Sequence, residues 1–429
     1  MDNRTAQAMI RFGLGRRGNE PLPADPVAWL KDQVEAEDVP FDAKLPTSAD
    51  GLTVLREQYK LNLPAGPALV QPLFNADVAA QTERLVETGA PFRERLVWFW
   101  ANHFTVSVRQ GGTNGVIGPY IREAIRPNVT GPFFAMLLAV MRHPAMLMYL
   151  DNNNSYGPNS LVGRAQKRGL NENLARECLE LHTLGVGGGY SQADVTAFAA
   201  VISGWSVEFN RLYPGFQFRE VAHEPGVKTV LGRRFPAGET SGVAALEMLA
   251  HHPSTYRHLA TRLVRHFVAD VPPPDAVRVI EGVLSDTRGD LGAASTALVG
   301  LEAAWAPLAK LRSPQDYAVA ALRALDLQGE KKVPLAGVLG SLGQPLWTAP
   351  LPNGWADAAG DWAGPEAMMR RIDWSYSVAG RAGDRDAGEV AEGALGPLLR
   401  RETREAMRGA GSRRDALTLL LTSPEFQRR

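Results

Sequence analysis

Apolar residues recur at intervals of three and four along most of the chain, which places them on one face of a helix. Several of these runs begin after a capping residue or a proline and end at glycine, as helices do. The pattern therefore predicts a mainly helical protein. We expect helices over 93–104, 133–150, 172–184, 194–203, 243–251, 254–270, 274–284, 314–327, 365–374 and 390–408.

One region has a different pattern. Between Ser206 and Phe235, aromatic and β-branched residues are interrupted by Tyr213-Pro214-Gly215 and Glu224-Pro225-Gly226. Such runs separated by turn residues are typical of β-hairpins. The predicted fold class is mainly α, a single multi-helix body with a small β-hairpin insertion near residues 206–235.

The domain prediction follows from the same pattern. We expect one helical domain over 1–429, with an N-terminal helical segment (1–62), central helices (73–205), a β insertion (206–240) and C-terminal helices (241–429). Stretches rich in Gly, Pro, Asn or Ser at 63–72, 151–170, 328–361 and 378–388 are predicted connectors. No internal repeat of solenoid period is present.

Composition excludes several classes of protein. The 46 basic side chains equal the 46 acidic ones, so we expect no nucleic-acid partner. No apolar run reaches the roughly 18 residues of a membrane span. The single cysteine, Cys178, excludes an internal disulfide and multi-cysteine metal sites. The first residues lack a continuous apolar stretch, so we predict no signal peptide and a cytoplasmic location.

The most informative stretch runs from Asn171 to Trp205. Asn171 is a good N-cap, and Gly185 stands where a left-handed residue would end the helix. A second helix starts at Ser191 to Asp194, which fits the S-x-x-[DE] capping box, and Gly204 supplies the next stop. The sequence therefore predicts two helices joined by a glycine turn.

Helical geometry divides the first of these helices into two faces. At roughly 100° per residue, the acidic residues and His182 point in different directions, so no single-helix E-x-x-H ligand set is available. An alternative to a functional site is that Arg176 pairs with its neighbouring glutamates on an ordinary solvated face. Likewise, a histidine on the apolar face, such as His182, is commonly a core residue that bonds to a neighbour. The predicted polar face holds Glu172, Asn173, Arg176, Glu177, Glu180 and Thr183, and the apolar face Leu174, Ala175, Cys178, Leu179 and His182.

The string NENLARECLELHTLGVGGGYSQADV, followed by SGW, resembles the signature of the bacterial family known as domain of unknown function 1800. The resemblance extends along the chain through RLVWFWANHF (95–104), MYLDNNN (148–154), HEPGVKTVLG (223–232), HHPSTYRHLATRLVRHFV (251–268), LGQPLWTAPLPNGW (342–355) and SPEF (423–426). It implies a mostly helical bacterial protein without an assigned activity. The resemblance also implies that many relatives are exported through twin-arginine signals, whereas we expect no such signal here. Many relatives are encoded beside a family resembling sulfatases and alkaline phosphatases, so such a protein is an implied partner.

Histidine and carboxylate side chains in these motifs suggest a metal site, because together they suit Zn, Fe or Mn. No H-E-x-x-H, EF-hand loop, dinucleotide loop or G-x-S-x-G elbow is present. The candidate catalytic residues are Glu177, Glu180, Arg176 and His182; the candidate substrate-binding residues are Asn102, His103, Asp151, Asn173 and Trp205; the candidate metal ligands are His223, Glu177 and Asp151.

Two hypotheses follow. The first is an enzyme, a metal-dependent hydrolase in which a glutamate acts as base and Arg176 holds an anion. The second is a non-catalytic binding or assembly protein whose polar groups form a buried network that fixes helix packing. The second predicts that removing Glu177 or Arg176 strongly destabilises the fold, because each change would leave a buried partner unpaired.

Overall fold

The computed structural model describes residues 1–41, 44–61, 69–110, 112–210, 212–327 and 329–429. Helices dominate these residues, and the strands form two small antiparallel sheets, so the predicted fold class is confirmed. In the part of the chain that is described, no helix combines the length and apolar character needed to cross a membrane.

The regular elements described before Trp205 are all helical. The α-helices among them are α1 (Asn3–Gln7), α2 (Pro26–Glu35), α3 (Ser48–Lys60), α4 (Gln71–Glu87), α5 (Pro91–His103), α6 (Ile117–Tyr120), α7 (Phe133–Arg142), α8 (Pro144–Tyr149), α9 (Leu161–Gln166), α10 (Asn173–Glu177) and α11 (Gln192–Val201).

Two hairpins separate these helices from the second half. Strand β1 (Trp205–Glu208) pairs with β2 (Gly215–Phe218), and β3 (Lys228–Val230) pairs with β4 (Arg233–Phe235). The remaining helices are α12 (Glu239–Ala250), α13 (Pro253–Phe267), α14 (Pro274–Asp286), α15 (Leu291–Gly300), α16 (Pro314–Leu325), α17 (Leu335–Ser341), α18 (Pro365–Arg381), α19 (Ala387–Ala394), α20 (Arg401–Arg408) and α21 (Arg413–Thr422).

Proline divides two of the predicted helices. The predicted helix 133–150 is two helices, α7 and α8, because Pro144 has no N–H to continue the first one. The predicted helix 390–408 is likewise divided near Pro397 into α19 and α20. The predicted connector 328–361 contains α17 within its described part, so that prediction was wrong in part.

The helix pair of the 171–205 stretch has the predicted signals. The Ser191 hydroxyl and the Asp194 carboxylate form the capping box of α11. Gly185 has a φ of 82°, and a Cβ built there would lie 2.7 Å from His258 Nδ1, so this turn requires glycine. The other carboxylate oxygen of Asp194 accepts the N–H of Leu231 at 2.7 Å, which ties the β3–β4 turn to α11.

The first helix of this pair changes type along its length. It is α-helical only to Glu177 and then forms a π-helical segment over Cys178–His182. The wider turn lets the Thr183 hydroxyl donate to the carbonyl oxygen of Cys178 at 2.6 Å. Thr183 is therefore buried, not part of the polar face as predicted, whereas the five residues predicted for the apolar face are all buried.

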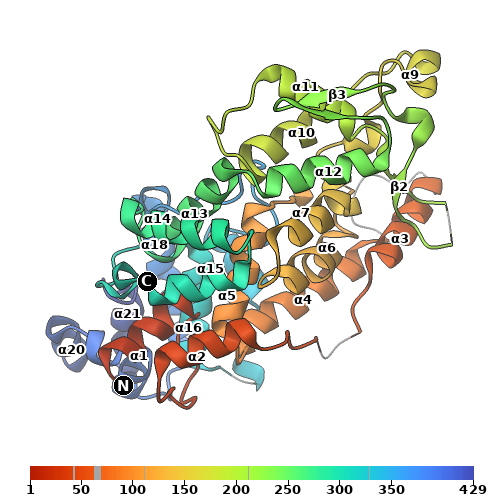
Figure 1. Ribbon diagram of the computed structural model, residues 1–429. Coiled ribbons are helices and arrows are strands. Elements are labelled where there is room, and N and C mark those ends of the chain that lie inside the picture. The colour runs from red at the N-terminus through yellow and green to blue at the C-terminus, as the bar shows by residue number, and fades with distance from the viewer. Residues whose placement is uncertain (42–43, 62–68, 111, 211, 328) are drawn as a thin grey trace.

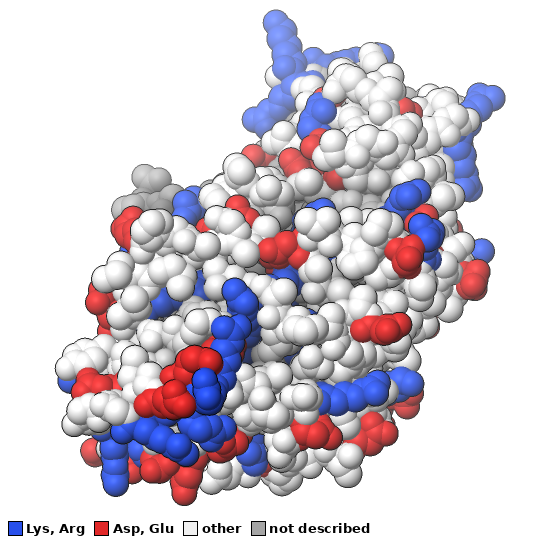
Figure 2. Space-filling model, turned by 90° about the vertical axis from the view of Figure 1, so that its left-hand side faces the viewer, with Lys and Arg blue, Asp and Glu red and all other residues white. Residues whose placement is uncertain are grey.

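The molecule is elongated, with the hairpins and α9–α11 at one end and both chain termini at the other (Figure 1). One apolar cluster spans α5, α7, α12 and α13, and a second joins α16–α21 to residues near the N-terminus. Buried Arg95 connects α5 of the first cluster to α16 of the second, since it donates to Asp316 at 2.7 Å. Buried Arg323 ties α16 to the N-terminal residues and the end of α4, since it donates to the carbonyl oxygens of Gly15, Val86 and Thr88. Positive and negative side chains are interspersed over the face drawn in Figure 2.

Candidate functional site

The polar face of α10 lies at the surface and pairs largely with itself. Arg176 donates to Glu172 and to Gln192, each at 3.0 Å. The other carboxylate oxygen of Glu172 accepts the Thr196 hydroxyl at 2.6 Å. Arg176, the predicted anion holder, therefore already has its charge paired within the hairpin.

Glu177 and Glu180 stand one turn apart and are both half-buried. Burial raises the pKa of Glu177, the charge of Glu180 raises it further, and Arg176 opposes the shift. Tyr149 is buried nearby, and burial together with the charge of Glu177 raises its pKa to about 12. The structure thus brings the two predicted carboxylates together, and these surroundings favour protonation of Glu177.

His182 faces the core, where it meets His103 and His258. Nε2 of His103 donates to the carbonyl oxygen of His182 at 3.1 Å, and Nε2 of His258 donates to that of Leu181 at 2.9 Å. Neither ring nitrogen of His182 has a partner among the described residues. Burial lowers the pKa of His182 to about 3 and that of His258 to about 4, so all three rings are neutral at pH 7.

The other residues predicted around α10 are dispersed. Asp151 is exposed with a φ of 55°, and Asn173 is exposed at the start of α10. Trp205 is fully buried under the Arg142 guanidinium, which lies 5.2 Å from its ring. His223 is buried and donates through Nδ1 to the carbonyl oxygen of Ser203 at 2.8 Å, while Nε2 accepts the Gly238 N–H at 3.0 Å.

The predicted metal set His223, Glu177 and Asp151 stays a prediction. Throughout the described ranges, no group of three or more His, Cys, Asp or Glu side chains has an arrangement that could hold a metal ion. In His223, both ring nitrogens already have hydrogen-bond partners.

A second group of polar residues lies between the two apolar clusters, where the stretches 95–104, 251–268 and 342–355 meet. We call this the cationic cavity. It is lined by Arg95, Trp98, Phe99 and Asn102 of α5, by Arg262, Arg265 and His266 of α13, by Ser313 and Asp316 at the start of α16, and by Gln344, Trp355, Ala356 and Asp357.

Its acidic side chains are already paired. Asp316 accepts from Arg95 at 2.7 Å and lies 2.8 Å from Nε of Arg429. Asp357 lies 3.0 Å from Arg429 and accepts from Nδ1 of His266 at 3.2 Å. These contacts join α5, α13, α16 and the C-terminal residues in one buried network.

Charge pairing determines the ionisation of this network. Burial alone would raise the pKa of Asp316, but the guanidiniums of Arg429 and Arg95 hold it well below its usual range. Asp357 is shifted in the same direction, against burial, by His266 and Arg429. Burial lowers the pKa of His266 to about 4. At pH 7 both carboxylates are therefore charged and the histidine is neutral.

Three other side chains of the cavity have unused donors. Arg262 and Arg265, one turn apart on α13 and half-buried, make no hydrogen bond or ion pair within the described residues. Gln344 is buried; its amide oxygen accepts the Gln315 N–H at 2.9 Å, and its amide nitrogen has no acceptor there. Burial lowers the pKa of Arg262, and its charge remains available to a ligand.

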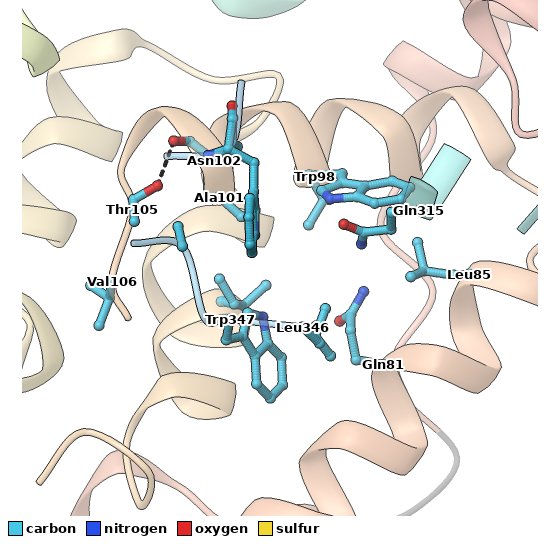
Figure 3. Close-up of a pocket in the computed structure, with 14 residues that line it drawn as sticks. Gln81, Leu85, Trp98, Ala101, Asn102, Thr105, Val106, Gln315, Leu346 and Trp347 are labelled. Atoms are coloured by element: carbon cyan, nitrogen blue, oxygen red, sulfur yellow. Dashed lines mark hydrogen bonds between the residues drawn. The ribbon is translucent and has the colours of Figure 1, made fainter. Parts of the chain in front are cut away.

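A neighbouring cavity, which we call the tryptophan cavity, shares Trp98, Asn102 and Trp355 with the cationic one. The Asn102 side chain donates to the carbonyl oxygen of Trp355 at 2.9 Å and accepts its N–H at 2.8 Å. Gly354 allows this contact, because a Cβ there would lie 2.5 Å from the Asn102 carbonyl oxygen. Figure 3 shows the amides of Gln81 and Gln315 facing this cavity below the Trp98 ring.

Of the predicted substrate-binding residues, Asn102 lies in these cavities. Sequence reasoning missed Arg262, Arg265, Gln344 and Gln315. One signal was present: Arg262 and Arg265 stand beside the apolar stripe of an amphipathic helix, where a charged side chain is carried towards the interior.

Comparisons with known proteins give a family and no activity. No curated protein and no solved structure matches the chain. The model of a family described as "Protein of unknown function (DUF1800)" matches residues 7–428, nearly the whole chain. The protein therefore belongs to the DUF1800 family.

Proposed function

We propose that the protein binds a ligand through an anionic group, a carboxylate or a phosphate, in the cationic cavity. The observation that carries this proposal is the pair Arg262 and Arg265, whose guanidiniums line the cavity without a partner among the described residues. Arginine suits this role because its planar donors match carboxylate and phosphate oxygens.

The surroundings support this assignment. The two carboxylates of the cavity form their ion pairs with Arg95 and Arg429 and none with the α13 guanidiniums among the described residues. The charge of Asp357 reaches Arg262 without contact and opposes the lowering of the Arg262 pKa by burial. Half-buried cations without a partner lose hydration, and an incoming anion restores favourable contacts. The cavity volume of about 50 Å³ suits one such group with its waters.

The two hypotheses drawn from the sequence stay predictions. The raised pKa of Glu177 supports an enzyme, because shifted carboxylates are common at catalytic sites. The Arg176 pairs support neither hypothesis. A hydrolase of the predicted kind needs Arg176 to hold an anion, but its guanidinium is already paired, and a closed network needs these pairs to be buried, but they lie at the surface.

Thermal melting and calorimetric titration with inorganic phosphate and with acetate test the proposal. We expect at least one of these anions to stabilise the wild-type chain, and Arg262→Gln to weaken its binding by about 10- to 100-fold, the value of one or two charged hydrogen bonds. The Arg262→Gln, Arg265→Gln double variant should lose binding.

Arg257→Gln is the matched control, because Arg257 is exposed on the same helix outside the cavity. The control should bind the anion as the wild type does. Equal binding by the wild type and the double variant, or no binding of either anion by the wild type, would overturn the proposal.

A further inference from the structure

Gln315 is the most unusual polar residue of the tryptophan cavity. Its side chain is only 3% exposed, yet its amide makes no hydrogen bond among the described residues. The backbone N–H of Gln315 is used by Gln344, so the residue is held in place while its amide lines the cavity. Buried amides without partners are rare because they lose hydration without compensation. A ligand group with both donor and acceptor capacity would satisfy it.

Three indole rings line the same cavity as this amide. Trp98, Trp347 and Trp355 are half-buried in the cavity wall, and none of their N–H groups has an acceptor in the described part of the chain. Indoles offer an apolar face together with one donor. A sugar ring complements this combination, because its C–H face packs against an indole and its hydroxyls both donate to and accept from amides.

The size of the cavities indicates how such a ligand would lie. Each has a volume of about 50 Å³, whereas a site for a whole small molecule measures roughly 300–1,000 Å³. Trp98, Asn102 and Trp355 form a common wall, and the hydrogen bonds between Asn102 and Trp355 fix part of it. Because the two cavities share these three lining residues, a small ligand in contact with them would reach both cavities with adjacent groups rather than be enclosed by either one.

We propose that this ligand is an acidic sugar, with its ring at the tryptophan cavity and its carboxylate or phosphate at Arg262 and Arg265. This inference rests on the proposed anion binding and adds the chemical class of the ligand. The Gln315 amide and the amide oxygen of Gln81, whose nitrogen donates to Glu94 at 3.0 Å, hydrogen-bond the hydroxyls, and the indole of Trp347 packs against the ring.

Calorimetric titration of the full chain with D-glucuronate, D-glucose and acetate tests the proposal. Glucuronate should bind at least about tenfold more tightly than either fragment, since it joins both sets of contacts. Gln315→Leu, which preserves size, should weaken glucuronate binding by about tenfold and leave acetate binding unchanged. Arg262→Gln should weaken both.

Two further variants guard against a folding defect. Gln166→Leu changes an exposed glutamine far along the chain and should bind as the wild type does. Trp347→Leu should keep the wild-type melting temperature within a few degrees, weaken glucuronate binding and reduce the change in tryptophan fluorescence that glucuronate induces, since Trp98 and Trp355 remain in the cavity.

The outcomes separate the two proposals. If acetate binds through Arg262 but glucuronate binds no better, or if Gln315→Leu has no effect on glucuronate binding, the acidic-sugar inference is overturned and the anion site stands. If benzoate binds more tightly than glucuronate, the cavity prefers an aromatic ring and the sugar class is overturned. If no anion binding depends on Arg262, the proposed function itself fails.

Discussion

The polar face of the α10–α11 hairpin and the cationic cavity are both rich in charge, but they use it differently. In the hairpin, Arg176 pairs with Glu172 and Gln192 at the surface. In the cavity, Asp316 is buried between two arginines, and Arg262, which lines the same cavity, has no hydrogen bond or ion pair among the described residues. The charged side chains of the hairpin thus pair with one another, whereas the guanidiniums of Arg262 and Arg265 in the cavity have donors left for a ligand.

The α10–α11 hairpin contains the sequence signature of the family, whereas the cationic cavity is the proposed binding site. The hairpin carries the most recognisable stretch of sequence because its turn needs Gly185 and its second helix needs the Ser191 capping box. These are requirements of local structure. Hydrogen-bond donors without acceptors occur in the cationic cavity, where α5, α13 and the loop before α18 come together. Their position depends on the tertiary fold, because these segments are far apart in sequence.

The largest expected contrast between the two regions is in stability. Asp316→Ala should lower the free energy of unfolding by about 3–5 kcal/mol, because it leaves Arg95 and Arg429 buried without their carboxylate. Glu172→Ala, the matched change in the hairpin, should cost less than about 1 kcal/mol, since exposed pairs contribute little. Urea unfolding at pH 7 measures both. Similar losses for the two variants would contradict the comparison.

The same division explains how much could be predicted from sequence. The fold class, the small β-hairpin insertion and the capping box of α11 follow from local patterns, and so does the burial of Leu174 and Cys178. The π-helical segment over Cys178–His182 does not, because the spacing of its apolar residues also fits the α-helix that was predicted there. The cavities were missed for a related reason: Asn102, Arg262 and Gln344 are far apart in sequence, and only the tertiary fold makes them neighbours.

The next largest effect concerns the buried histidines, which lie between the hairpin and the cavity. The pKa of His182 is about 3 in the folded chain and 6.5 in the unfolded chain, so the unfolded state binds the proton first as pH falls. The stability contributed by the neutral ring is present above pH 6.5 and decreases below it. Between pH 7 and 4.5 the loss should be about 2–3 kcal/mol for this residue.

His182→Leu tests this pH dependence. Because Leu cannot be protonated, the variant should lose less stability than the wild type over the same pH range. At pH 7 the two chains should differ little, since neither ring nitrogen of His182 has a partner to lose among the described residues. Unfolding curves at pH 7 and pH 4.5 give the comparison. Parallel pH profiles would show that His182 does not titrate as inferred.

The smallest expected effect is the change in stability caused by Glu177→Gln. It tests directly whether the polar face of the hairpin is a surface or a closed network. The raised pKa of Glu177 means that the folded chain holds the carboxylate less favourably than the unfolded chain does at pH 7. Glu177→Gln should therefore raise the free energy of unfolding, by less than about 1 kcal/mol because the side chain is half-buried and partly screened. The gain should disappear as pH falls through the raised pKa, where wild-type Glu177 becomes protonated. A strong loss of stability in Glu177→Gln would instead support the closed polar network and make the hairpin resemble the Asp316 network energetically.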